Sequence, residues 1–133
     1  MPVAKIHVTE GQYSEQQLSD ISAAVLSSLV DVISCPPDDF FQQIRVLPRN
    51  RFLHTPSYLG LKYTEKFIYL ELTFLLGRSK ETKLALLQQL NDRIVATVGI
   101  SPDDLMTLIY EIPGENCSFG QGIAQRANVV QKP

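Results

Sequence analysis

The sequence PDDFFQQIRVLP, residues 37–48, returns 65 residues later as PDDLMTLIYEIP, residues 102–113. Each stretch opens with a proline and two aspartates, continues as a strand-like apolar run and closes on a proline. Ser14 and Ser79 stand at the same offset, and each precedes a helical pattern. Three matches at one offset predict two copies of one supersecondary unit, at residues 2–48 and 67–113.

Each copy has the pattern strand, helix, strand. In the first copy Ser14 is the expected helix N-cap, and Gln17 completes a capping box. In the second copy Ser79 is the cap, and Gly99 ends the helix. The predicted strands cover residues 3–9, 43–47, 67–75 and 105–112. Apolar residues at helical spacing define the two predicted buried faces: Leu18, Ile21, Val25, Leu29 and Val32 in the first helix, and Leu84, Leu87, Leu90, Ile94 and Val98 in the second.

A strand–helix–strand unit usually forms a parallel pair of strands. Two such units predict an α+β fold in which two helices cover one face of a four-stranded sheet. The other face lacks cover within the chain, so we expect an oligomer that buries it. Residues 49–66 are expected to join the copies as a loop or a hairpin, and residues 120–133 to form a tail that packs or frays.

The composition sets broad limits on function. The chain of 133 residues has the size of a single domain, spanning residues 1–133, and its net charge of −2 gives no reason to expect nucleic acid. Charged residues interrupt the longest apolar run, so we expect no membrane span, and the N-terminus does not resemble a signal peptide. Two cysteines do not make a metal set. We therefore expect a cytoplasmic protein without metal or cofactor.

Pro2 follows Met1 directly and opens an apolar strand. A methionine before a small residue is normally removed, which would leave a free prolyl amine at the start of a strand. Burial disfavours the charged form of such an amine, which can then act as a base or a nucleophile. The alternative is that Pro2 is simply a tolerated first residue of a strand.

Three stretches resemble the tautomerase superfamily, whose members use an N-terminal proline. The opening PVAKIHVTEG, residues 2–11, resembles the start of 4-oxalocrotonate tautomerase. GRS at residues 77–79 resembles the stretch before that family's helix, and SFGQG at residues 118–122 resembles its C-terminal motif. The chain length, the PDD turn and the run from Ser118 to Gln125 are closer to malonate semialdehyde decarboxylase. The resemblance implies a duplicated β-α-β unit that assembles as a homotrimer and acts on a small carboxylate substrate.

The resemblance also implies roles for single residues. Pro2 would be the catalytic amine, Arg78 would bind the substrate carboxylate, and Phe119 would keep the amine dry. Asp39 would activate water in a decarboxylase, but as part of a PDD turn it is equally well explained as a structural residue. Arg45 matches a substrate-assisting arginine of 4-oxalocrotonate tautomerase, although an ion pair across an oligomer contact explains it slightly better.

Two departures from the decarboxylase pattern bear on substrate choice. Cys117 stands where the decarboxylase has tryptophan, so it would line a roomier pocket, and as a small apolar residue it is a poor candidate for a nucleophile. Leu76 stands where the decarboxylase has a second arginine. The sequence therefore favours a tautomerase acting on a 2-keto or enol carboxylate. A malonate semialdehyde-type decarboxylase or hydratase, and a non-catalytic trimeric binding protein, remain as alternatives.

Overall fold

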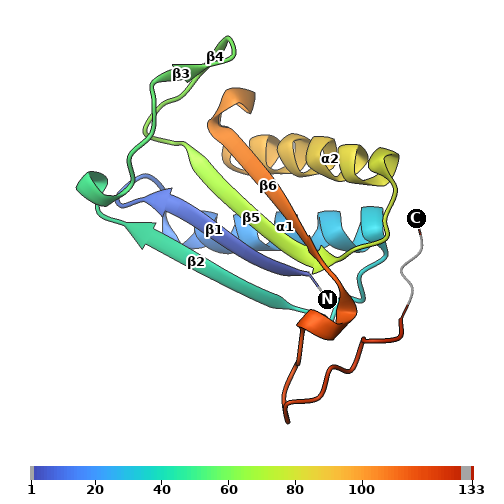
Figure 1. Ribbon diagram of the computed structural model, residues 1–133. Helices are drawn as coiled ribbons and strands as arrows, with labels where there is room; N and C mark the ends of the chain where they lie inside the picture. The colour runs from blue at the N-terminus through green and yellow to red at the C-terminus, as the bar shows by residue number, and fades with distance from the viewer. Residues whose placement is uncertain (1, 130–132) are drawn as a thin grey trace.

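The computed structural model describes residues 2–129 and residue 133, and Figure 1 shows the arrangement of its elements. The strands of one sheet are β1 (Val3–Thr9), β2 (Phe41–Leu47), β5 (Ile68–Leu75) and β6 (Leu105–Ile112). The helices α1 (Glu15–Ile33) and α2 (Lys80–Val98) both lie on one face of that sheet. The predicted α+β architecture is thereby confirmed. Within the described residues, no helix is long and apolar enough to cross a membrane.

The sheet has the order β2-β1-β5-β6. β1 pairs with β2 in parallel, and β5 pairs with β6 in parallel, as two strand–helix–strand units require. The two units meet in the middle, where β1 and β5 run antiparallel. Both helices have 19 residues, and α1 begins 65 positions before α2, which is the offset seen in the sequence. The duplicated pattern therefore corresponds to two similar units side by side.

The helix boundaries follow from their caps. The side chain of Ser14 accepts from the backbone N–H of Gln17, whose own side chain accepts from the N–H of Ser14, so the predicted capping box is present. Ser79 caps α2 in the same way through the N–H of Thr82. Gly99 ends α2 with a φ of 71°, a left-handed conformation that suits glycine.

The core lies between the helices and the sheet. It contains Ala4, Ile6 and Val8 of β1 together with alternate residues of β5 and the inner faces of the helices. In α2 the predicted residues Leu90 and Ile94 are buried, and Val98 packs against the core, but the third buried residue is Leu86, which the prediction lacked. Leu84 is 54% exposed. Leu86, Leu90 and Ile94 are four residues apart and so lie on the same face of the helix, toward the core. Leu84 lies on a different face and points partly away from the core.

The boundaries of two strands also differ from the prediction. β2 begins at Phe41 rather than at residue 43, and β5 begins at Ile68, directly after Phe67. Residues 49–66 contain a short helical turn, η1 (Arg49–Arg51), and a hairpin of β3 (Ser57–Tyr58) and β4 (Leu61–Lys62).

The sheet face opposite the helices has no cover within the described chain. Phe41, Met106, Leu108 and Tyr110 lie on it and are more than a third exposed. Among them the face carries polar side chains, including His7 and Glu71, whose Nε2 and Oε2 atoms lie 2.7 Å apart. This face agrees with the predicted uncovered surface.

Candidate active site

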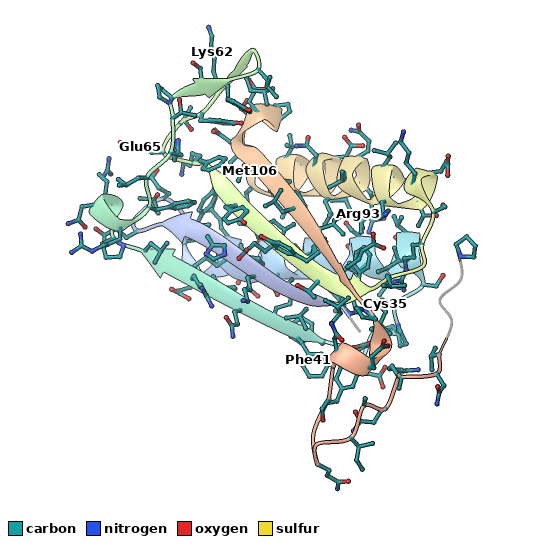
Figure 2. The ribbon with its side chains drawn as sticks, viewed as in Figure 1. Cys35, Phe41, Lys62, Glu65, Arg93 and Met106 are labelled. Carbon is teal, nitrogen blue, oxygen red and sulfur yellow. The ribbon has the colours of Figure 1, made fainter. Side chains whose placement is uncertain are left out.

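The start of β1, the ends of α1, β5 and β6 and the beginning of α2 all lie at one end of the sheet (Figure 1). A cavity of about 370 Å³ opens there. Figure 2 shows Cys35 and Phe41 at this end beside the segment that follows β6, while Lys62 and Glu65 mark the opposite end. The cavity is lined by Pro2, Val32, Ile33, Ser34, Cys35, Pro36, Asp39, Leu75, Arg78, Thr82, Arg126, Val129 and Pro133.

Pro2 reaches this cavity because it directly precedes the central strand β1. It is buried, with apolar groups from the end of α1 and the end of β5 in the same lining. Proline fits the first position of a strand, where its missing N–H removes no hydrogen bond from the ladder. The position therefore offers a backbone nitrogen next to a small, mostly apolar hollow.

Arg78 enters the same cavity from the start of α2. Its guanidinium lies over the ring of Phe74, 5.0 Å from the ring centre, and Nη1 donates to the carbonyl of Leu75 at 3.2 Å. Desolvation lowers the pKa of this half-buried guanidinium below its ordinary value. An arginine remains cationic at neutral pH even so, and it offers a planar fork of donors that suits a carboxylate.

Asp39 is half-buried in the turn between α1 and β2, and it lines both this cavity and a neighbouring one. Cys35 is buried next to it, and its thiol donates to the carbonyls of Pro36 and Asp39 at 3.3 Å and 3.5 Å. Burial raises the pKa of Cys35, and the charge of Asp39 adds to the rise. This thiol is therefore a poor nucleophile, because it resists ionisation.

The neighbouring cavity, of about 420 Å³, includes Phe119 in its lining. The ring of Phe119 lies 6.0 Å from the ring of Phe41 at the start of β2. Phe119 thus lies next to the cavity of Pro2 and not among the residues that line it.

Cys117 and Arg45 are not among the lining residues of either cavity. Cys117 is half-buried at the end of the turn η3 (Gly114–Asn116), where its N–H donates to the carbonyl of Gly114. Arg45 is exposed on the open sheet face and donates to Oε1 of Gln43 at 3.0 Å. Within the described residues, neither Cys117 nor Arg45 therefore lines a cavity together with Pro2.

Sequence reasoning missed Cys35, Thr82 and Arg126. Thr82 lies in the first turn of α2, and Cys35 lies just after the end of α1. Both helix ends could be predicted from the sequence, so these two residues could have been placed at the cavity. Arg126 carried no signal, since it lies in a stretch that the pattern described only as a tail. Leu76, which stands at the position of the second arginine, is 50% exposed and is absent from the lining.

The opposite end of the sheet also has a cavity, of about 340 Å³, but the residues of the second unit there differ in kind. At the 65-residue offset Phe67 corresponds to Pro2, and it is only 3% exposed, with the rings of His54 and Tyr63 at 4.5 Å and 4.8 Å from its own ring centre. Tyr13 corresponds to Arg78, and its hydroxyl donates to the carbonyl of Lys66 at 2.5 Å. An aromatic ring and a phenol thus replace the proline and the guanidinium of the first unit.

Asp104, the counterpart of Asp39, also has a different environment. It is 1% exposed and accepts from the N–H of Thr64 at 2.8 Å and from the hydroxyl of Thr64 at 2.6 Å. These bonds hold the end of the hairpin segment to the start of β6. The second aspartate of the repeated motif is therefore structural in one unit and faces a cavity in the other.

The chain is similar to proteins of known family. The family model described as tautomerase enzyme matches residues 39–120. The probable tautomerase YusQ of Bacillus subtilis (strain 168) is 34% identical over 125 residues, which are 94% of this chain and 98% of that protein.

Solved structures with the same fold include two malonate semialdehyde decarboxylases. One, described with its decarboxylase and hydratase activities, has a TM-score of 0.84 at 24% identity, covering 92% of this chain and 94% of that one. The FG41 enzyme inhibited by 3-bromopropiolate has a TM-score of 0.84 at 26% identity over 93% of both chains. A fused 4-OT symmetric trimer has a TM-score of 0.78 at 18% identity, covering 96% of this chain and 98% of that one. With the family model and the curated relative in agreement, the chain belongs to the tautomerase superfamily.

Proposed function

We propose that this chain is a tautomerase that uses the amine of Pro2 to move a proton between the oxygen and the carbon of a small 2-keto or enol carboxylate. One observation carries the proposal: Pro2 and Arg78 line the same small cavity. A proton-transfer enzyme needs a base within reach of the substrate and a fixed partner for the substrate's charge. The two residues supply these two functions from different secondary structure elements.

The proposed reaction changes no oxidation state. The neutral amine of Pro2 takes the proton from the enol O–H, and the resulting N–H gives a proton to the neighbouring carbon as the carbonyl forms. Arg78 holds the carboxylate, which orients the enol toward the amine. The apolar part of the lining excludes water, and both burial and the nearby guanidinium favour the neutral amine.

The mechanism requires that Met1 be removed, and this residue lies outside the described part of the chain. The experiment is therefore a substrate screen on protein whose first residue has been identified as Pro2 by mass spectrometry. We expect turnover of enol carboxylates such as 2-hydroxymuconate and loss of most of it in Pro2→Ala and Arg78→Ala. Absence of turnover of both enol carboxylates and malonate semialdehyde by the unaltered mature protein would leave the non-catalytic binding protein as the function.

A decarboxylase or hydratase is the second candidate, because Asp39 lies in the lining of the same cavity. A carboxylate there could orient a water molecule toward a substrate held by Arg78. The likeness to the two malonate semialdehyde decarboxylases supports this candidate, and Leu76 in place of a second arginine speaks against it.

We further propose that the chain assembles as a homotrimer in the cytoplasm. The open sheet face exposes Phe41, Met106, Leu108 and Tyr110, which a second and third copy would remove from water. A fused 4-OT with this fold forms a symmetric trimer. Light scattering tests the assembly, and a monomer at micromolar concentration would contradict it.

A further inference from the structure

The segment that follows β6 is folded back on itself and held by a glutamine. The N–H of Phe119 donates to Oε1 of Gln125 at 3.0 Å, and Nε2 of Gln125 donates to the carbonyl of Gly120 at 3.1 Å. Backbone bonds from Ile123 to Gly120 and from Val129 to Arg126 add successive turns. Up to Val129 the predicted tail thus has hydrogen bonds of its own, although nearly all of its residues are exposed, and residues 130–132 lie outside the described residues.

The backbone of this segment lies in close contact with Gly114, in the turn after β6. A Cβ atom on Gly114 would lie 2.1 Å from the carbonyl oxygen of Arg126 and 2.7 Å from its carbonyl carbon. Real side chains do not approach backbone atoms so closely, so residue 114 must be glycine for Arg126 to remain in place. The turn after β6 therefore sets the position of Arg126.

Arg126 belongs to the linings of both cavities, as Asp39 and Pro36 do. It is exposed, whereas Arg78 is half-buried beside Pro2. The first cavity thus has two guanidinium groups from different elements, one at the start of α2 and one in the C-terminal segment. The second cavity continues from Arg126 past Gln125 and Phe119.

We propose that Arg126 determines substrate specificity by binding a second acidic group, at the end of the substrate away from the carboxylate that Arg78 holds. The inference rests on the proposed function, because it takes Arg78 as the partner of the first carboxylate. A substrate with a carboxylate at each end pairs both ends with a guanidinium. A substrate with an apolar far end leaves Arg126 in water and gains nothing from it.

The competing explanation is that Arg126 only offsets the charge of Asp39 near the cavity. In that case removal of the Arg126 side chain weakens the binding of every anionic ligand to a similar extent, because it changes only the electrostatic potential of the cavity. A specific contact instead affects only ligands that carry the second acidic group. The comparison of two ligands that differ in this group separates the explanations.

The probes are 2-oxoadipate and 2-oxohexanoate, which have six carbons each and differ in one terminal carboxylate. Isothermal titration calorimetry gives their affinities for the mature, full-length protein, so the readout does not depend on turnover. We expect the unaltered protein to prefer 2-oxoadipate, and Arg126→Ala to weaken its binding about tenfold or more while changing 2-oxohexanoate less than about twofold. Arg126→Lys should restore part of the preference, and Arg51→Ala, an exposed arginine of η1, should change neither affinity.

Gly114→Ala tests the same contact without removing a charge, because it displaces the backbone of Arg126. We expect a reduced preference for 2-oxoadipate at a melting temperature near that of the unaltered protein. Equal affinities in the unaltered protein, or an equal loss for both probes in Arg126→Ala, would overturn the inference while leaving the proposed function in place. Binding of neither probe by the unaltered protein, or no effect of Arg78→Ala on either, would overturn both.

Discussion

Nε2 of His7 lies 2.7 Å from Oε2 of Glu71 and so joins the two central strands on the sheet face opposite the helices. The other carboxylate oxygen accepts from the hydroxyls of Tyr69 and Tyr110 at 3.0 Å and 3.1 Å. The ring of His7 stacks on that of Tyr69 with 5.0 Å between the ring centres. Three elements therefore meet at one carboxylate, in the area where further copies of the chain would pack.

These contacts make a prediction for Glu71→Gln. The hydrogen bond from His7 is the main reason why the pKa of Glu71 is lowered, and the two tyrosine hydroxyls lower it further. A carboxyl group with a lowered pKa stabilises the folded state at pH values above its unfolded pKa, and this contribution is lost as the pH falls through the folded pKa. We expect the substitution to cost about 1–3 kcal/mol at neutral pH and progressively less as the pH falls through the folded pKa of Glu71, as measured by urea unfolding.

Glu65→Gln is the matched control, because the carboxylate of Glu65 is 62% exposed in a surface ion pair with Arg49. Exposed ion pairs of this kind contribute little to the free energy of unfolding, so we expect this variant to be nearly as stable as the unaltered protein. A Glu71→Gln protein as stable as the control at neutral pH would contradict the assigned contribution of the network.

A second prediction compares the two aspartates of the repeated motif. Asp104→Ala removes both bonds to Thr64 in a fully buried place, and we expect a loss of about 2–4 kcal/mol in the free energy of unfolding. Asp39→Ala, at the corresponding half-buried position, should cost less than about 1 kcal/mol. Chemical denaturation of both variants gives the comparison, and equal losses would show that Asp39 is structural as well.

A third prediction concerns covalent labelling. The mature protein should react with 3-bromopropiolate at the amine of Pro2, because burial and the neighbouring guanidinium favour the neutral, nucleophilic form. Peptide mapping by mass spectrometry identifies the site. Protein that retains Met1 is the control and should not be labelled at Pro2. Modification confined to lysines or to Cys117 in the mature protein would count against a reactive prolyl amine.

A fourth prediction separates the two enzyme candidates. Tautomerisation needs no activated water, so Asp39→Asn should leave enol turnover within a few-fold of the unaltered protein. Pro2→Ala and Arg78→Ala should each reduce kcat/KM by about 10²- to 10⁴-fold. If Asp39→Asn instead abolishes decarboxylation of malonate semialdehyde by such a factor, the decarboxylase is the function.

The regular elements could be predicted because their signals are local. The capping box of Ser14 and Gln17 set the start of α1, and Gly99 set the end of α2. The repeated PDD turns set the start of each outer strand to within two residues. The buried stripe of α2 was only partly predicted: Leu90 and Ile94 are buried, whereas Leu86 was missed, since apolar residues on several sides of that helix left the choice of face to the packing against α1.

The cavity was only partly predictable. Pro2, Asp39 and Arg78 came from motifs, and the parallel topology of each unit brings their elements to one end of the sheet. Arg126 could not be found, because its place depends on a backbone contact with Gly114 that no residue pattern encodes. The placement of Arg45 and Cys117 outside both linings follows from sheet register and from the turn η3, which the sequence does not specify in space.

The duplication does not repeat the prolyl amine, because the second unit has Phe67 at the position that corresponds to Pro2. The first unit has a proline at its strand start beside a cavity, whereas the second unit has a buried phenylalanine at the corresponding position, and the cavity near it is lined by other residues. An assembly of such chains therefore has as many prolyl amines as subunits, and a titrating reagent would consume one equivalent per chain. In the second unit the corresponding aspartate, Asp104, has a structural role, since it accepts a hydrogen bond from Thr64 after the hairpin.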